Sequence, residues 1–215
     1  MSEMRGILAF ETCTTGCSVA VGDGKTMLAS LTDERLNYQA RELLPMIEAA
    51  LKQAGMTYAD LQALVTTTGP GSFTGIRVGL AAARAIVLAH KMRTIGLNTL
   101  EAIAWRAIQQ SDLSSQKRIA SVWNASKGQA YVQSFEWSDQ HLITLANPQL
   151  IDVEKLPAFL KKFDLVAGNV IADSITAPHA EALLLRCKFQ GLNELPLVPL
   201  YIRDADAKLP GTKTA

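Results

Sequence analysis

The strongest chemical signal in this chain of 215 residues is a glycine-rich loop, "TTTGPGSFTGIRVG", that runs from Thr66 to Gly79. Glycine permits tight or positive-φ backbone, and Ser72 or Thr74 could cap the helix that follows. The free N–H groups at the start of that helix could also attract an anion. The Lys-Ser/Thr ending of a Walker loop is missing, and Arg77 follows instead. Two interpretations stay open at this point, a structural start of a helix and a phosphate contact.

Histidine and cysteine offer little further chemistry. The three histidines, His90, His141 and His179, lie far apart in the sequence, which favours surface or capping roles over a metal site. No HExxH motif is present, and this counts against a metalloprotease. Cys13 and Cys17 flank a turn, and they could be a redox pair or, as the pattern favours, two small buried hydrophobes.

Composition limits the class of protein. Hydrophobic residues make up 48% of the chain and charged residues 19%, as expected for a folded globular protein. The net charge is +1, without the basic stripe expected of a dedicated nucleic-acid binder. We see no apolar run of the roughly 18 residues that a membrane span needs, and no signal peptide in "MSEMRGILAFET". The odd number of cysteines, three, fits a reducing compartment, so we expect a cytoplasmic protein.

The first half of the sequence predicts three strands, a helix, a strand, a helix, a strand and a helix. The strands are expected at 6–12, 17–23, 26–34, 61–69 and 93–98, and the helices at 35–55, 75–91 and 99–110. The first helix repeats apolar residues with a 3.6 period and stops at Gly55, with Pro45 in its middle. Thr99 is the expected N-cap of the third helix.

The order of elements then repeats. A hairpin at 118–126 and 129–137 turns at Lys127 and Gly128, and a strand at 141–151, a helix at 153–162, a strand at 163–169 and a helix at 177–189 follow. The last stretch, 195–215, is punctuated by proline and is expected to be extended. We therefore predict an α/β protein with mixed sheets in two similar lobes, residues 1–103 and 104–215.

The helix over 75–91 is apolar nearly all round, so it must be buried on every side. Gly75, Gly79 and Ala83 recur every four residues, and small residues let another backbone approach closely. One explanation is burial between the two lobes of the chain. The other is contact with a partner protein.

Five segments together resemble the TsaB family, also called YeaZ: "ILAFETCTTGCSVAV", "ELLPMIEAAL", "TGPGSFTGIRVGLAAARAI", "IGLNTLEAIA" and "PLYIRDAD". The resemblance implies the two-lobed fold of actin, Hsp70 and the sugar kinases (the ASKHA fold). It also implies a non-catalytic accessory subunit that pairs with TsaD and TsaE in forming threonylcarbamoyladenosine beside the anticodon of tRNA. The resemblance favours the second explanation for the apolar helix, a partner interface with TsaD. The residues predicted to make this interface are Leu43, Leu44, Ile47, Leu51, Val78, Ala82, Ala85 and Ala89.

The resemblance also identifies the positions where superfamily enzymes carry acidic groups. These positions hold Glu11, one methylene longer than the usual aspartate, and Asn124, an amide that cannot act as a general base. We therefore expect no catalytic residues, no metal and no cofactor, with ATP only at a junction with TsaD and TsaE. Glu11, Ser72 and Thr74 remain candidates for an anion or nucleotide contact, and the isolated chain is expected to form a homodimer. The alternatives are a self-sufficient ATP-dependent transferase and a glycopeptidase.

Overall fold

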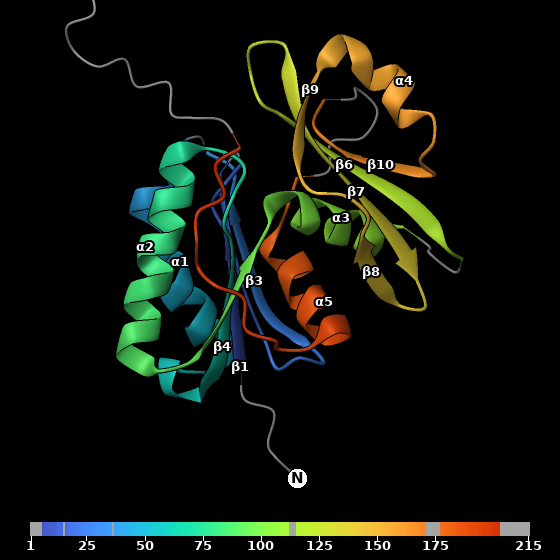
Figure 1. The fold of residues 1–215 in the computed structure, drawn as a ribbon. Coiled ribbons are helices and arrows are strands. Elements are labelled where there is room, and N and C mark those ends of the chain that lie inside the picture. Colours follow the sequence, from blue (N-terminus) through green and yellow to red (C-terminus); the bar gives the residue numbers. More distant parts are fainter. Residues whose placement is uncertain (1–5, 15, 36, 112–114, 171–176, 203–215) are drawn as a thin grey trace, which may run out of the picture.

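The structure, a computed structural model, describes residues 6–14, 16–35, 37–111, 115–170 and 177–202 (Figure 1). The first sheet has the strand order β3-β2-β1-β4-β5. Its strands are β1 (Gly6–Glu11), β2 (Cys17–Gly22), β3 (Met27–Asp33), β4 (Leu61–Thr67) and β5 (Arg93–Leu97). The first three pair antiparallel, whereas β4 and β5 run parallel to β1, which gives the predicted mixed sheet.

Two helices cover one face of this sheet, α1 (Gln39–Ala54) and α2 (Phe73–His90). Helix α1 ends where Gly55 adopts a left-handed conformation, φ 66°, as the sequence predicts. Helix α2 is long and apolar enough to meet the length and composition of a membrane span, contrary to our expectation from sequence. It packs one face on the sheet instead, through Ile76, Leu80, Ala83 and Ile86.

The second sheet contains β6 (Lys117–Asn124), β7 (Gln129–Ser138), β8 (His141–Thr144), β9 (Gln149–Asp152) and β10 (Leu165–Gly168). Its order is β10-β6-β7-β8, and β9 also pairs with β7. The single strand predicted over 141–151 is therefore wrong. It is split into β8, which pairs with the end of β7, and β9, which pairs with its beginning. The helix predicted over 153–162 is shorter too, a 3-10 turn at Val153–Lys155 followed by α4 (Leu156–Leu160).

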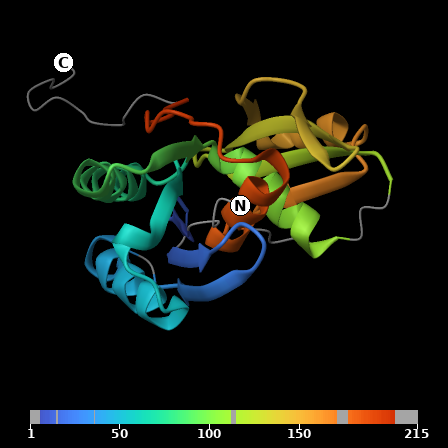
Figure 2. The ribbon, with the colours of Figure 1, turned by 90° about the horizontal axis from the view of Figure 1, so that it is seen from below.

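Helices α3 (Thr99–Gln110) and α5 (Ala180–Gln190) form the layer between the two sheets (Figures 1 and 2). One continuous core joins both helices to both sheets, with Trp105 stacked on Phe189 and edge-on to Trp137. The N-cap of α3 is Asn98 rather than the predicted Thr99, because the Asn98 side chain accepts the N–H of Leu100 at 2.8 Å. The layers therefore follow one another in this order: α1 with α2, the first sheet, α3 with α5, the second sheet, and α4.

The proposed boundary at residue 103 falls inside α3, and α5, which follows it in sequence, packs on the first sheet. The division of the chain into two lobes, residues 1–103 and 104–215, therefore stays a prediction from the repeated order of elements. After α5 the chain returns to the first lobe, where Leu195 pairs with Ile95 of β5 and Leu200 donates its N–H to Thr68. Residues 195–202 of the stretch predicted to be extended hold one isolated bridge and no helix, and residues 203–215 lie outside the described part.

Candidate functional site

The predicted partner residues lie on α1 and α2, and their burial separates them into two groups. Leu43, Ile47 and Leu51 are buried in the core beneath their own helix, so their assignment to a partner surface is wrong. The reason is that the 3.6-residue apolar stripe of α1 faces its own sheet, which an amphipathic helix must do first. Leu44 points the other way and is 52% exposed.

On α2, Ala85 and Ala89 are exposed, whereas Val78 and Ala82 are half-buried against the core. Leu88, which was not predicted, is 84% exposed, the largest value among the large hydrophobic side chains of the described residues. It lies three residues after Ala85, so helical spacing alone would have placed it on the same face. We call Ala85, Leu88 and Ala89 the outer apolar face.

The glycines in α2 and just before it allow close packing within the chain itself. A side-chain carbon at Gly75 would overlap the carbonyl oxygen of Thr12, and one at Gly71 would overlap that of Cys13. Thr12 also donates its hydroxyl to the carbonyl of Gly75 at 2.8 Å. The stripe of small residues at Gly75 and Gly79 was predicted to let another backbone approach closely. The backbone that approaches it is the segment after β1, rather than a partner or the second lobe.

The glycine-rich loop is a structural start of a helix. Ser72 caps α2 by accepting the N–H of Gly75 at 3.2 Å, as one of the two interpretations expected. Thr74 is exposed in the first turn of α2. The guanidinium carbon of Arg77 lies over the Phe73 ring, 3.7 Å from its centre, and Phe73 packs against Tyr201.

Glu11 ends β1 and is 2% exposed. Its carboxylate accepts the N–H of Cys13 at 2.5 Å and the hydroxyls of Thr14 and Thr67 at 2.9 and 3.3 Å. Burial outweighs these donors and raises the pKa of Glu11 from 4.5 to about 7. A carboxylate that is enclosed and already hydrogen-bonded three times holds the turn after β1, and it is poorly placed to bind a metal.

Asn124, at the end of β6, lies elsewhere. It borders a cavity of about 300 Å³ between the lobes, which we call the inter-lobe cavity; its lining is Cys13, Thr14, Gly71, Ser72, Trp123, Asn124, Ala125, Ser126, Tyr131 and Asn169. Glu11 borders a different cavity, of about 450 Å³, with Cys17, Thr32, Arg106 and His179 among its lining. Glu11 and Asn124, the two positions predicted to correspond to superfamily acids, therefore do not line the same cavity, and of the three anion candidates only Ser72 borders the inter-lobe cavity.

The histidines and cysteines occupy structural positions. His179 caps α5 by accepting the N–H of Glu181 at 3.3 Å, and His90 stacks on Tyr58. Within the described ranges no group of three or more His, Cys, Asp or Glu side chains could hold a metal ion. Cys13 and Cys17 are both free and buried, and burial raises the pKa of each thiol to about 12, which supports the interpretation as small hydrophobes.

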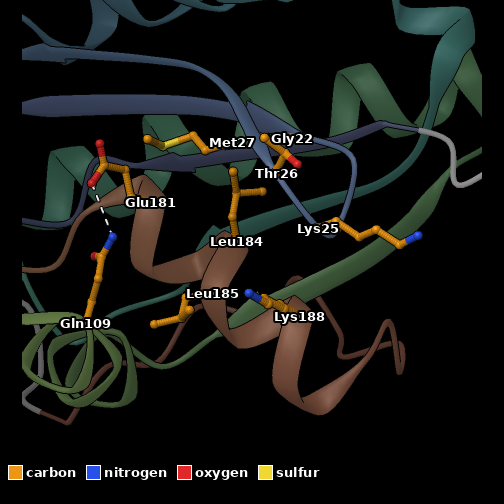
Figure 3. A pocket seen from close by; sticks show the side chains of 10 residues that line it. Gly22, Lys25, Thr26, Met27, Gln109, Glu181, Leu184, Leu185 and Lys188 are labelled. Carbon is orange, nitrogen blue, oxygen red and sulfur yellow. Dashed lines mark hydrogen bonds between the residues drawn. The ribbon is translucent and has the colours of Figure 1, made fainter. Parts of the chain in front are cut away.

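A small pocket of about 140 Å³ opens between the β2–β3 turn, α3 and α5 (Figure 3). Glu181 and Gln109 face each other across it at 3.4 Å. The Glu181 carboxylate also accepts the hydroxyl of Ser30 at 2.8 Å and the guanidinium of Arg106 at 2.9 Å. Since its oxygens are engaged by side chains from β3 and α3, this carboxylate ties the lobes together. The sequence offered no signal for this cluster, because its members lie up to 151 positions apart.

The sheet orders and the helix layers define a two-lobed ASKHA fold of mixed sheets. A solved structure from Pseudomonas aeruginosa, of a protein described as similar to the peptidase YeaZ, shares this fold with a TM-score of 0.79 at 23% identity, covering 93% of this chain and 100% of the other.

Two curated relatives carry the name tRNA threonylcarbamoyladenosine biosynthesis protein TsaB. The one from Buchnera aphidicola (Schizaphis graminum) is 32% identical over 73% of each chain, and the one from Escherichia coli is 28% identical over 95% of this chain and 98% of its own. The model of the family described as TsaD, tRNA N6-adenosine threonylcarbamoyltransferase, matches residues 37–192. The chain therefore belongs to the TsaD-related family and, within it, to the TsaB (YeaZ) branch.

Proposed function

We propose that this chain is a non-catalytic subunit in the formation of threonylcarbamoyladenosine in tRNA, and that it acts by binding TsaD through the outer apolar face. The names of the TsaB relatives support the pathway, and the match to the TsaD model supports a related partner. The observation that carries the proposal is the exposure of Leu88, Ala85 and Ala89 on a helix whose opposite face is sealed on the sheet. Contiguous exposed apolar residues of this kind mark interaction sites.

The chemistry of the face suggests what it binds. Helix α2 contains no acidic residue, and its exposed side carries Arg77 and Arg84 beside the alanines and Leu88. Arg84 is held by the carbonyl of Leu197 at 2.6 Å, so one cation has a fixed position at the rim. A helix pair with small apolar residues at its centre and carboxylates at its rim would complement this face.

The interior supports a non-enzymatic role. Glu11 is enclosed and hydrogen-bonded, and Asn124 is an amide in a separate cavity, so these two positions do not form a pair of acids at one substrate position. We infer that the chain needs no cofactor of its own and that ATP binds only where TsaD and TsaE meet it. A cytoplasmic location follows from the role in tRNA modification.

The test is the variant Ala85→Glu, with Ala158→Glu as matched control, since both alanines are exposed helical residues but Ala158 lies on α4 of the second lobe. A glutamate at position 85 stays in water in the free subunit but would be buried without a partner in the complex. We expect its Kd for the same organism's TsaD, measured by calorimetry, to rise by roughly a hundredfold or more, with an unchanged melting temperature. Ala158→Glu should bind like the wild type.

The same variant tests self-association. Without TsaD, we propose that two copies pair through the outer apolar face, so light scattering should show a wild-type dimer and a monomer for Ala85→Glu. TsaE should bind the TsaB–TsaD pair rather than either chain alone. Unaltered TsaD binding by Ala85→Glu would show that the face is not the interface, and ATP turnover by the isolated chain would refute the non-catalytic role.

A further inference from the structure

Side chains of the first sheet fasten the start of α5, away from the outer apolar face. The Ser18 hydroxyl of β2 accepts the N–H of Ala180 at 3.0 Å. His179, the N-cap of α5, makes a further contact, because its Nε2 lies 2.8 Å from the hydroxyl oxygen of Thr32 on β3. Since α5 belongs to the layer between the two sheets (Figures 1 and 2), the contacts at its start help to set how that layer packs.

The hydrogen bonds of His179 define which ring nitrogen carries the proton. Nδ1 accepts the N–H of Glu181 at 3.3 Å, so this nitrogen must be unprotonated. The neutral ring then carries its proton on Nε2, and Nε2 donates to the hydroxyl oxygen of Thr32. The two contacts are therefore made together by the neutral imidazole in this one tautomer. A doubly protonated ring would place an N–H of its own against the N–H of Glu181.

The surroundings of His179 oppose its protonation. The side chain is only 15% exposed, and this burial is the main reason why the pKa of His179 is lowered from 6.5. The guanidinium of Arg106 on α3 lowers the pKa further, whereas the carboxylate of Glu181 raises it. Glu181 lies 3.9 Å from Nδ1 but already accepts hydrogen bonds from Ser30 and Arg106. A positive charge at the N-terminus of a helix is unfavourable in addition.

His179 also lines the cavity of about 450 Å³ described above, and three other titratable side chains border it: Glu11, Cys17 and Glu34. Glu11 is enclosed by its own hydrogen-bond donors, and burial raises the pKa of the Cys17 thiol to about 12, so this thiol is neutral. Glu34 is exposed to water. Among the described side chains, the charges that act on His179 are thus those of Arg106 and Glu181.

We propose that His179 is a pH-sensitive clasp: the neutral ring holds the start of α5 against β3, and protonation of the ring releases the first turn of the helix. As pH falls through 6.5, the unfolded chain binds a proton at this histidine before the folded chain does, so the capped conformation loses stability. Once protonated, Nδ1 must turn away from the N–H of Glu181, and the first turn loses its cap. Because Ala177, Pro178 and His179 line the cavity, the release alters its wall.

NMR of the full ¹⁵N-labelled chain tests the starting state. Long-range ¹H–¹⁵N spectra distinguish the two neutral tautomers of histidine from the doubly protonated ring. At about pH 7.5, above the ordinary range of histidine titration, we expect His179 to be neutral with its proton on Nε2. A proton on Nδ1 at that pH, in either form of the ring, overturns the proposal.

Hydrogen exchange in the same chain measures the release. Between about pH 7.5 and pH 5.5, the protection factor of the Glu181 amide, corrected for the intrinsic pH dependence of exchange, should fall roughly fivefold, as expected for the loss of one N-cap. The amide of Gly75 is the internal control, because a serine caps it at the start of α2 and serine does not titrate in this range. Its protection should stay constant.

A pair of variants separates the clasp from other effects of acid. Asparagine is a good N-cap that carries no charge at any pH, so His179→Asn should fold and should show no fall in the protection of Glu181. His141→Asn makes the same change on β8 of the second sheet and should keep the fall seen in the wild type. A fall of equal size in His179→Asn, or constant protection of Glu181 in the wild type, overturns the proposal.

Discussion

Glu11 offers a prediction whose size follows from the structure. Its pKa is raised from 4.5 to about 7, chiefly because burial disfavours the charged carboxylate. Below pH 4.5 the group is protonated in both the folded and the unfolded chain, and its protonation costs nothing. As pH rises through 7 it must ionise inside the fold, so the folded state loses stability. The difference between the two pKa values corresponds to roughly 3 kcal/mol in the free energy of unfolding.

The variant Glu11→Gln removes this cost because it is neutral at every pH. Its remaining oxygen can accept from Cys13 and Thr67 as Glu11 does, and the hydroxyl of Thr14 can rotate to accept from the new amide. Between pH 5 and pH 8 we expect the wild type to lose about 2.5 kcal/mol relative to this variant. For a chain of this size that is a change of about 5–10 °C in the difference between the two melting temperatures.

Circular dichroism melting of both proteins across this range measures the difference, in which all other titrating groups cancel. The matched control is Glu34→Gln, since Glu34 is an exposed glutamate next to β3. If the Glu11→Gln difference does not change with pH, the carboxylate is not desolvated as the structure indicates. If Glu11→Gln loses TsaD-dependent tRNA modification while remaining folded and bound to TsaD, the carboxylate has a chemical role and the non-catalytic proposal fails.

Two further predictions concern packing and reactivity. Gly75→Ala should lower the free energy of unfolding by more than about 2 kcal/mol, because its new carbon meets the Thr12 carbonyl, whereas Gly55→Ala should cost only about 1 kcal/mol, since nothing lies near it and only its positive φ is strained. Equal losses in chemical denaturation would argue against the tight contact. Cys13, Cys17 and Cys187 are buried with raised pKa values, so a thiol reagent should modify none of them in the native chain and all three after unfolding. Rapid modification of Cys13 or Cys17 in the folded protein would reopen the redox interpretation.

The sequence predicted the fold well where local patterns decide it. The short strand segments of β1 to β3 with turns between them, the 3.6-residue period of α1 and its stop at Gly55 are local signals, and each element lies within a few residues of its expected place. The strand predicted over 141–151 was wrong because it ran across Asn147 and Pro148, a dipeptide that marks a turn. β7 is ten residues long, and two short strands pair with its two halves, which no local pattern reports.

The site was harder to predict, because the same apolar residue serves a core or an interface. Leu43 and Ile47 have the period of a buried stripe, and that period says only that one face is covered, not by what. Their own sheet covers them. Leu44, beside Leu43 in the sequence, breaks the stripe and for that reason is left on the outside. An apolar residue outside the stripe is the better signal of a partner surface, and Leu88 on α2 fits the same rule.

Helix α2 shows why its sequence is apolar nearly all round. Gly75 and Gly79 bring it so close to the segment after β1 that a side chain at either position would collide with Thr12. This contact positions the helix without any help from the opposite side, where Ala85, Leu88 and Ala89 remain exposed. If these residues only faced water, polar substitution would be free, and leaving them apolar would carry a risk of aggregation. A helix fixed by its inner face and apolar on its outer face is therefore a rigid platform, and rigidity lowers the conformational cost of binding. On this argument the glycines act on partner binding indirectly: a variant such as Gly79→Ala, which shifts α2 while leaving Ala85 and Leu88 unchanged, should weaken TsaD binding although it alters no residue of the outer apolar face.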